Sequence, residues 1–275
     1  MIQSTPAAAA GIAKPDGRRR WLIIALLFVA TTVNYVDRTM LGLLAPSLGK
    51  EMGWSENDYG TIVTAFQAAY AMGFLVMGWL IDRFGPKIGY AIAITVWTIG
   101  HVAHGFASTV AGFMAARVVL GVGEAGHFPA VARSSSEWFP QKERALAIGW
   151  VNSGTTIGVI LTAPVLALFM NHLGLGWRET FIWSGLFGVA LLALWWKLYS
   201  NPRESGLVSE AELAWIEHDP PEKVDQVPWR RLITMREAWA FAVAKFLTDP
   251  VWFLMLFWLP KYFSTTYNVD LKVVL

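Results

Sequence analysis

A short charged turn, Gly78-Trp79-Leu80-Ile81-Asp82-Arg83-Phe84-Gly85-Pro86-Lys87, separates two long apolar runs. The runs cover about residues 58–81 and 88–107, and a helix needs about 20 apolar residues to cross a bilayer. The two glycines of the turn permit a close approach and a sharp change of direction. Its charged side chains can meet neighbouring helix ends and hold a latch there. The pattern predicts two membrane-spanning helices joined by a tight, basic turn.

The rest of the chain repeats this alternation of apolar runs and polar connectors. Hydrophobic residues make up 55% of the chain and charged residues 15%, which is too apolar for a soluble protein of this length. Five further apolar runs are long enough to span a membrane, and they cover about residues 21–48, 110–132, 145–170, 180–199 and 237–263. The expected fold is therefore an all-α membrane protein with seven spanning helices.

The polar segments set the expected orientation. Residues 1–20 run directly into a first helix that is too long for a signal peptide, so we expect this helix to be retained. Residues 200–236 have the composition of a solvated linker, with a short helix near 209–217. On the side of the membrane that holds the N-terminus and this linker there are 15 Lys and Arg residues, against 4 on the other side. This bias predicts that both segments are cytoplasmic.

Several function classes find no support in the sequence. The chain has no cysteine, which removes disulfides and thiol chemistry, and its net charge of +2 is too small to suggest nucleic acid as a partner. It has no cluster with metal-ligand spacing, no phosphate-binding glycine loop and no candidate nucleophile. We therefore expect neither an enzyme nor a resident metal or cofactor.

The charged turn resembles the signature of the major facilitator superfamily, a glycine followed after three residues by Asp-Arg-x-Gly and closed by a basic residue. The resemblance implies two six-helix bundles joined by a cytoplasmic linker. It divides the chain into residues 1–20 (N-terminus), 21–199 (N-terminal six-helix bundle), 200–236 (linker) and 237–275 (the first helix of the C-terminal bundle and the loop after it). The residues expected to form the cytoplasmic gate motif are Gly78, Asp82, Arg83, Gly85 and Lys87.

Four further stretches carry a narrower resemblance. They are Asn34-Tyr35-Val36-Asp37-Arg38, residues 117–125, residues 245–252 and residues 258–262. Together they are similar to the anion:cation symporter family, and within it to bacterial hexuronate transporters. The resemblance implies proton-coupled symport of a sugar acid, such as glucuronate or galacturonate, by a monomer in the cytoplasmic membrane. The family has twelve helices, so a chain that stops after seven is expected to be a fragment or a truncated product.

The charged residues within the apolar runs define the candidate site. Asp37 and Arg38 are neighbours, which point about 100° apart on a helix and must find separate partners. Arg117 and Glu124 are seven residues apart, so they share a helix face about 10.5 Å apart. Because helix 21–48 and helix 110–132 run in opposite directions, Arg117 should lie level with Asp37 and Arg38, and Glu124 nearer the cytoplasm. Two cations and two carboxylates should therefore surround one cavity.

The resemblance implies a role for each of these residues. Arg38 binds the substrate carboxylate, Asp37 and Glu124 carry protons, and Arg117 pairs with Asp37. A buried carboxylate takes up or releases a proton as a nearby arginine changes partner, so substrate occupancy can gate the proton. The further substrate-binding candidates are Tyr35, Tyr70 and Lys245, whereas His101 and His104 are expected at the membrane interface.

Three alternatives stay open at this point. The same arginines suit another organic anion or phosphate. The charges on the two helices can also form a purely structural network. A truncated chain can be a membrane protein that does not transport.

Overall fold

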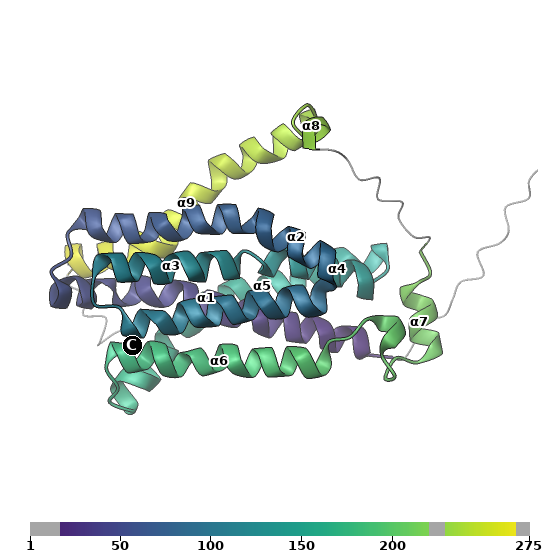
Figure 1. Ribbon diagram of the computed structural model, residues 1–275, viewed down its shortest axis with the longest axis horizontal. Helices are drawn as coiled ribbons and strands as arrows, with labels where there is room; N and C mark the ends of the chain where they lie inside the picture. The colour runs from purple at the N-terminus through teal and green to yellow at the C-terminus, as the bar shows by residue number, and fades with distance from the viewer. Residues whose placement is uncertain (1–16, 220–228, 268–275) are drawn as a thin grey trace, which may run out of the picture.

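The computed structural model describes residues 17–219 and 229–267, which form a bundle of long helices (Figure 1). The α-helices are α1 (Arg19–Met52), α2 (Glu56–Ala103), α3 (Val110–Glu124), α4 (His127–Trp138), α5 (Gln141–Leu166), α6 (Trp177–Leu198), α7 (Glu210–Ile216), α8 (Trp229–Leu232) and α9 (Arg236–Tyr267). The short elements are η1 (His104–Phe106), η2 (Ala167–His172) and η3 (Pro202–Glu204). Within the described ranges all assigned elements are helical, as the sequence predicts.

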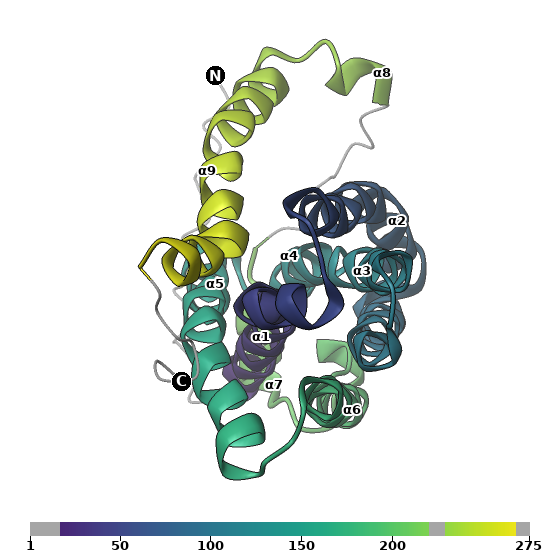
Figure 2. The same ribbon diagram turned by 90° about the vertical axis from the view of Figure 1, so that its left-hand side faces the viewer.

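Helix α1 lies at the centre of the bundle, between α5 and the group formed by α2, α3 and α4 (Figure 2). Two glycines let α5 approach the backbone of α1 closely. A Cβ on Gly154 would lie 2.8 Å from the Phe28 carbonyl oxygen, and one on Gly158 would lie 2.5 Å from the Thr32 oxygen. Small residues serve close helix packing in membranes because the hydrophobic effect does not drive helices together there. The spacing of these two glycines is therefore a packing feature, as the sequence suggests.

The charged turn folds the chain back on itself within α2. Gly85 has φ 76° and ψ 165°, a conformation that L residues rarely adopt, and it divides the element into arms 56–84 and 86–103. The arms lie close together, since a Cβ on Gly89 would be 2.7 Å from the Ile81 Cα atom. Ser55 and Asp58 cap the N-terminus of the first arm with a reciprocal capping box. The two helices predicted on either side of the turn are thus confirmed.

The prediction of one continuous helix over residues 110–132 is wrong. The chain breaks at Ala125 and Gly126, and α4 then extends to Trp138, into the stretch expected to be a polar connector. Pro129 explains the break, because it has no N–H to donate to the Ala125 carbonyl and its ring would collide with that carbonyl in a straight helix. Gly126 adds a packing reason, since a Cβ there would lie 2.6 Å from the Cβ of Ala93.

Five of the described helical stretches are long and apolar enough to cross a membrane, namely Arg19–Met52, Glu56–Phe106, Gln141–His172, Trp177–Leu198 and Arg236–Tyr267. The five stretches correspond to the seven predicted spans, because one stretch contains two spans and another span is divided between two shorter helices. The stretch Glu56–Phe106 contains both arms of α2, and the break at 125–126 leaves α3 and α4 each shorter than a full span.

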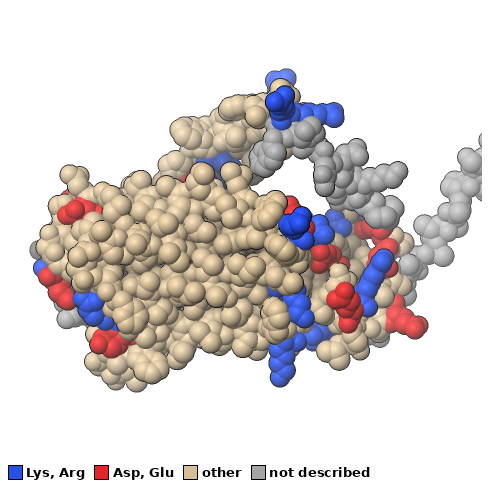
Figure 3. Space-filling model, in the orientation of Figure 1, with Lys and Arg blue, Asp and Glu red and all other residues tan. Residues whose placement is uncertain are grey.

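Charged residues gather at the two ends of the bundle and leave an apolar band between them (Figure 3). Such a band is expected where lipid covers the surface. By the order of the helices, one end of the bundle holds the turn at Gly85, the connection between α4 and α5 and the end of α6. We call it the basic end, because Arg83, Lys87, Arg133, Arg144 and Lys197 lie in or beside these segments. The opposite end holds the connection between α1 and α2 and the start of α6, with Lys50, Arg178 and Lys261 in or near them.

Helix α9 contacts the bundle near the opposite end and diverges from it toward α8 (Figures 1 and 2). The Tyr59 hydroxyl donates to the Phe257 carbonyl at 2.7 Å, and Lys261 Nζ lies 2.6 Å from Glu56 Oε2. Gly42 faces this contact too, and a Cβ there would lie at an ordinary van der Waals distance of 3.5 Å from the Leu256 oxygen.

The linker helix α7 docks at the start of α1. Its Glu212 carboxylate is buried and accepts from the Arg20 backbone N–H at 3.1 Å and from Arg20 Nη1 at 3.3 Å. Arg20 Nε also lies 3.2 Å from Glu143 of α5. The short helix expected in the linker is confirmed, but it packs against the bundle rather than lying free in solvent.

We expect Glu212→Ala to release α7 from the bundle. Arg20 and Glu212 are 1% and 2% exposed, and a hydrogen bond to a charged group contributes about 1.5–3 kcal/mol, although Arg20 keeps Glu143 as a partner. Limited proteolysis of the linker in lipid nanodiscs should therefore accelerate by about tenfold or more. The matched control is Glu217→Ala, because the Arg203–Glu217 pair is 75% and 40% exposed. Equal cleavage rates in the two variants would remove the docking role of Glu212.

Candidate functional site

Five titratable side chains from three helices meet in the interior of the bundle. Asp37 and Arg38 come from α1, His101 from α2, and Arg117 and Glu124 from α3. None of them is more than 2% exposed. An ionisable side chain within a membrane is costly unless it is paired, and such residues usually mark substrate or ion pathways. This cluster is the candidate site.

Arg38 and Glu124 form its central ion pair. Arg38 Nε donates to Glu124 Oε2 at 2.8 Å, while Oε1 of the same carboxylate has no hydrogen-bond partner among the described residues. The Arg38 guanidinium also lies over the rings of Tyr35 and Tyr70, at 4.7 and 4.5 Å from their centroids. The pair thus uses only Nε of the guanidinium, while Nη2 donates to Asn34 Oδ1 at 3.4 Å. An arginine placed in this way can still present donors to a second carboxylate.

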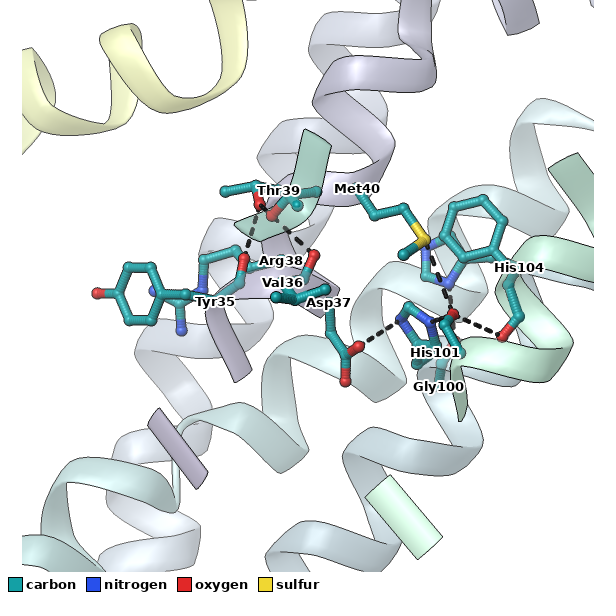
Figure 4. Close-up of polar contacts among 12 residues, drawn as sticks. Tyr35, Val36, Asp37, Arg38, Thr39, Met40, Gly100, His101 and His104 are labelled. Carbon is teal, nitrogen blue, oxygen red and sulfur yellow. Dashed lines mark hydrogen bonds and ion pairs between the residues drawn. The ribbon is translucent and has the colours of Figure 1, made fainter. Parts of the chain in front are cut away.

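Asp37 leaves α1 in a different direction and points toward His101 (Figure 4). Its Oδ1 atom lies 3.4 Å from His101 Nδ1. The expectation that the two adjacent charges find separate partners is therefore confirmed. The expectation that His101 and His104 are interfacial is wrong, because both are at most 1% exposed and pack against the Phe181 ring of α6.

Arg117 does not pair with Asp37 as predicted. It donates from both Nη atoms to the Arg38 carbonyl oxygen at 3.4 and 3.5 Å, and its Nε has no partner among the described residues. These contacts agree with the predicted common depth of Arg117 and Arg38. The predicted ion pair fails because Asp37 faces the second arm of α2, where His101 is available. Of the two arginines in the cluster, only Arg38 has a carboxylate within ion-pair distance in the parts of the chain that the structure covers.

Lys245 is not part of the cluster. It lies on α9 and pairs with Asp249 one turn away, at 2.6 Å, with the two side chains 54% and 38% exposed. Tyr35 and Tyr70, by contrast, lie within the cluster and are at most 9% exposed. The structure thus brings together six of the seven residues predicted for binding and coupling.

The gate-motif residues lie apart from the cluster, at the basic end. Asp82 and Arg83 are exposed, and Arg83 lies 6.0 Å from the centroids of the Trp79 and Phe84 rings. Lys87 reaches the Trp196 ring of α6 at 5.7 Å, and its carbonyl accepts from Trp195 Nε1. The turn is therefore anchored to α6, while Asp82 and Arg83 extend from the end of the bundle.

His101 is the site residue that sequence reasoning missed. A periodic signal was present, because Trp97, His101 and His104 recur three and four residues apart and so share one helix face. That face is buried in the structure, and Trp97 is 0% exposed. A third histidine, His127, is also buried, between Thr31 and Tyr90. The described residues contain no group of three or more His, Cys, Asp or Glu side chains that could hold a metal ion.

Comparisons with known proteins agree with this architecture. The family described as Major Facilitator Superfamily matches residues 27–275. The chain is 32% identical over 263 residues to the hexuronate transporter of Escherichia coli strain K12, covering 93% of this chain and 60% of the relative. It is 29% identical to the galacturonate transporter of Dickeya chrysanthemi, covering 93% of this chain and 75% of that protein. The chain thus spans about 60% of the length of the first of these relatives.

Among solved structures, the chain resembles a bacterial homologue of the human lysosomal transporter Spinster, in an inward-facing and unoccupied conformation. The TM-score is 0.74 at 18% identity, with 94% of this chain and 58% of that chain covered. This likeness supports the fold. The relatives found are transporters and not enzymes.

Proposed function

Because the chain belongs to the major facilitator superfamily, we propose that it forms the N-terminal part of a symporter that imports a sugar-acid anion together with protons. The observation that carries this proposal is the burial of two arginines and two carboxylates in one membrane-embedded cluster. The arginines of such a cluster can bind an anion, and its carboxylates can bind and release protons. Hexuronates such as glucuronate and galacturonate are the substrates we favour, because the similar relatives are named for them.

Arg38 is the residue we assign to the substrate carboxylate. Its planar guanidinium offers paired donors that match a carboxylate, and only its Nε is engaged by Glu124. Tyr35 and Tyr70 flank the guanidinium, so their hydroxyls are placed to meet the sugar. Arg117 adds a second positive charge without a carboxylate at ion-pair distance in the described chain, which further favours an anion.

Asp37 and Glu124 are the residues we assign to the coupling protons. Glu124 serves as counter-ion to Arg38 whenever no substrate carboxylate takes its place. When a substrate binds Arg38, Glu124 loses part of that interaction and takes up a proton more readily. The substrate and the proton then cross together, as symport requires. Glu124 therefore links occupancy of the site to its protonation.

We place the basic end on the cytoplasmic side of the bacterial inner membrane, following the bias of Lys and Arg in the connecting segments. Residues 1–20 and 200–236 then lie in the cytoplasm. The turn with Asp82 and Arg83 becomes the cytoplasmic gate motif, with its exposed charges available to a second bundle. The functional unit in this proposal is one full-length chain.

The test is uptake of labelled glucuronate and galacturonate by bacteria that lack hexuronate uptake and express the complete reading frame containing this chain. We expect accumulation that rises with an inward proton gradient and collapses with a protonophore. Glucose is the matched neutral competitor, because it differs from glucuronate only in carrying a CH2OH group where glucuronate has its carboxylate, and it should not inhibit. Uptake of labelled phosphate, with no uptake of either hexuronate, would favour the other anion. The absence of uptake of any tested anion would favour a membrane protein that does not transport.

A further inference from the structure

Asp37, His101 and Ser184 form a buried polar chain that runs from α1 through α2 to α6. Asp37 Oδ1 lies 3.4 Å from His101 Nδ1 (Figure 4). On the other side of the ring, His101 Nε2 lies 2.7 Å from Ser184 Oγ. None of the three residues is more than 2% exposed. We propose that Asp37 and His101 together hold one proton between Oδ1 and Nδ1, and that this shared proton is one of the coupling protons of the proposed symporter.

Ser184 fixes the tautomer of His101. The Ser184 hydroxyl lies 2.7 Å from the Thr180 carbonyl oxygen, an atom that has no hydrogen of its own and can only accept. Its other contacts besides His101, the Phe181 carbonyl and the Met40 sulfur, are acceptors as well. The single hydroxyl hydrogen is therefore committed to an acceptor, and the 2.7 Å contact with the ring needs a hydrogen on His101 Nε2. A neutral His101 then has a bare lone pair on Nδ1.

That lone pair faces a carboxylate. Asp37 Oδ1 and His101 Nδ1 are both buried, and neither has a hydrogen-bond partner elsewhere in the described chain. Two acceptors in this position repel each other unless one proton lies between them. The proton is carried either as a carboxylic acid that donates to Nδ1 or as an imidazolium that donates to the carboxylate. Both forms contain the same single proton, and its departure leaves a carboxylate and a neutral ring.

The charges around the pair connect this proton to the anion. Arg117 of α3 donates to the carbonyl of Arg38, the residue next to Asp37, and Glu124 of α3 pairs with the Arg38 guanidinium. With the proton present, the cluster has two arginines and one carboxylate, so it carries one net positive charge. Without it, Asp37 restores neutrality. One substrate carboxylate therefore neutralises the protonated cluster. This link between the proton and the substrate rests on the proposed function.

His104, the remaining titratable group beside the pair, does not change this count. Its Nδ1 lies 2.8 Å from the Gly100 carbonyl oxygen, which accepts from an N–H, and its ring stacks on Phe181. That contact holds a proton on Nδ1 in the neutral ring, so His104 takes no part in the Asp37–His101 contact.

His127 shows the contrasting arrangement. Its Nε2 lies 2.8 Å from Thr31 Oγ1, whose hydrogen is donated to the Leu27 carbonyl, and its Nδ1 lies 2.6 Å from the Tyr90 hydroxyl. The ring therefore donates from Nε2 and accepts at Nδ1 from the Tyr90 hydroxyl, with every position filled in the neutral form. His127 needs no extra proton, so it serves as an internal reference for His101.

Imidazole nitrogen NMR of the ¹⁵N-histidine-labelled chain in lipid nanodiscs tests the shared proton directly. We expect His101 to carry its hydrogen on Nε2 at alkaline pH, and to show one pH-dependent step that Asp37→Asn abolishes. His127 should not change in either sample. A hydrogen on Nδ1 of His101 at alkaline pH, or a step that persists in Asp37→Asn, would overturn the proposal. The alkaline tautomer is read in the parent chain, so it decides the matter even where Asp37→Asn does not fold.

Transport by the complete reading frame tests the coupling role. In His101→Asn no ring nitrogen remains to share the proton, so the buried Asp37 retains it as a carboxylic acid that donates to the amide oxygen, and the cluster keeps its net positive charge. Under a gradient of one pH unit, loss of one coupled proton should lower the attainable accumulation about tenfold. Exchange of labelled for unlabelled substrate should stay within about twofold of the parent, and His172→Asn is the control for histidine substitution. Unchanged accumulation, or exchange lost as fully as accumulation, would overturn the coupling role.

The NMR and transport experiments together separate this inference from the proposed function. If the parent reading frame takes up no sugar acid, the proposed function fails, and with it the coupling role of the pair. The NMR result then still decides whether the pair shares a proton. If the parent accumulates sugar acid but His101 carries its hydrogen on Nδ1, this inference alone fails.

Discussion

Replacing Arg38 by lysine should lower uptake of the sugar acid by about ten- to a hundredfold, with expression and membrane insertion close to normal. Lysine keeps the positive charge but loses the planar fork that engages Glu124 with one edge and leaves donors for a substrate carboxylate. Hydrogen bonds to charged groups contribute about 1.5–3 kcal/mol each, and about 1.4 kcal/mol corresponds to a factor of ten. The stacking of the guanidinium on Tyr35 and Tyr70 is lost as well.

The measurement is initial uptake at several substrate concentrations, normalised to the amount of protein in the membrane. Arg133→Lys is the matched control, because Arg133 is half exposed and pairs with Glu137 on the surface of α4. We expect a raised KM to be the main effect in the Arg38 variant, with a smaller fall in its maximal rate. Uptake equal to that of the parent would exclude Arg38 from substrate binding.

The positions of the spanning helices follow from the sequence because lipid imposes a simple rule. A spanning helix needs an apolar run of sufficient length, so such runs and their polar connectors are visible without a structure. Two features differ from the prediction, namely the break between α3 and α4 and the docking of α7. The first is caused by a single residue and the second by tertiary contacts. Pro129 breaks the predicted helix over 110–132. Helix α7 is held against the bundle by Glu212, whose partners lie about 190 residues away along the chain.

The candidate site is predictable in its members but not in its pairing. Charges in an apolar run stand out in any sequence, and helix periodicity separates Asp37 from Arg38. The choice of partner, however, depends on the rotation of α1 relative to α2 and α3, which the sequence of one helix does not specify. Arg117 was a plausible partner for Asp37, and the structure instead places His101 there. Histidine was overlooked because near the end of an apolar run it also suits the membrane interface.

Glu124→Gln should abolish proton-driven accumulation while exchange of labelled for unlabelled substrate persists. Glutamine has nearly the shape of a protonated glutamic acid and can still accept from Arg38 Nε, but it does not titrate. Net transport requires the carrier to return without substrate, and in that step Glu124 is the counter-ion of Arg38. In the Glu124→Gln variant the returning carrier would hold Arg38 as a buried cation without its counter-ion, which is costly within a membrane. Exchange avoids this step, because the loaded carrier returns with a substrate carboxylate on Arg38.

The assay pairs two measurements on the same vesicles, namely accumulation under an inward proton gradient and counterflow without a gradient. Glu217→Gln is the control, since its exposed pair with Arg203 lies outside the cluster. Asp37→Asn should show the same division between the two activities, because it removes the other proposed proton carrier. Accumulation against a gradient by Glu124→Gln would exclude Glu124 as a coupling residue. Equal loss of accumulation, counterflow and binding would instead favour a structural role for the Arg38–Glu124 pair, because a pair that only holds α1 and α3 together has no reason to spare exchange.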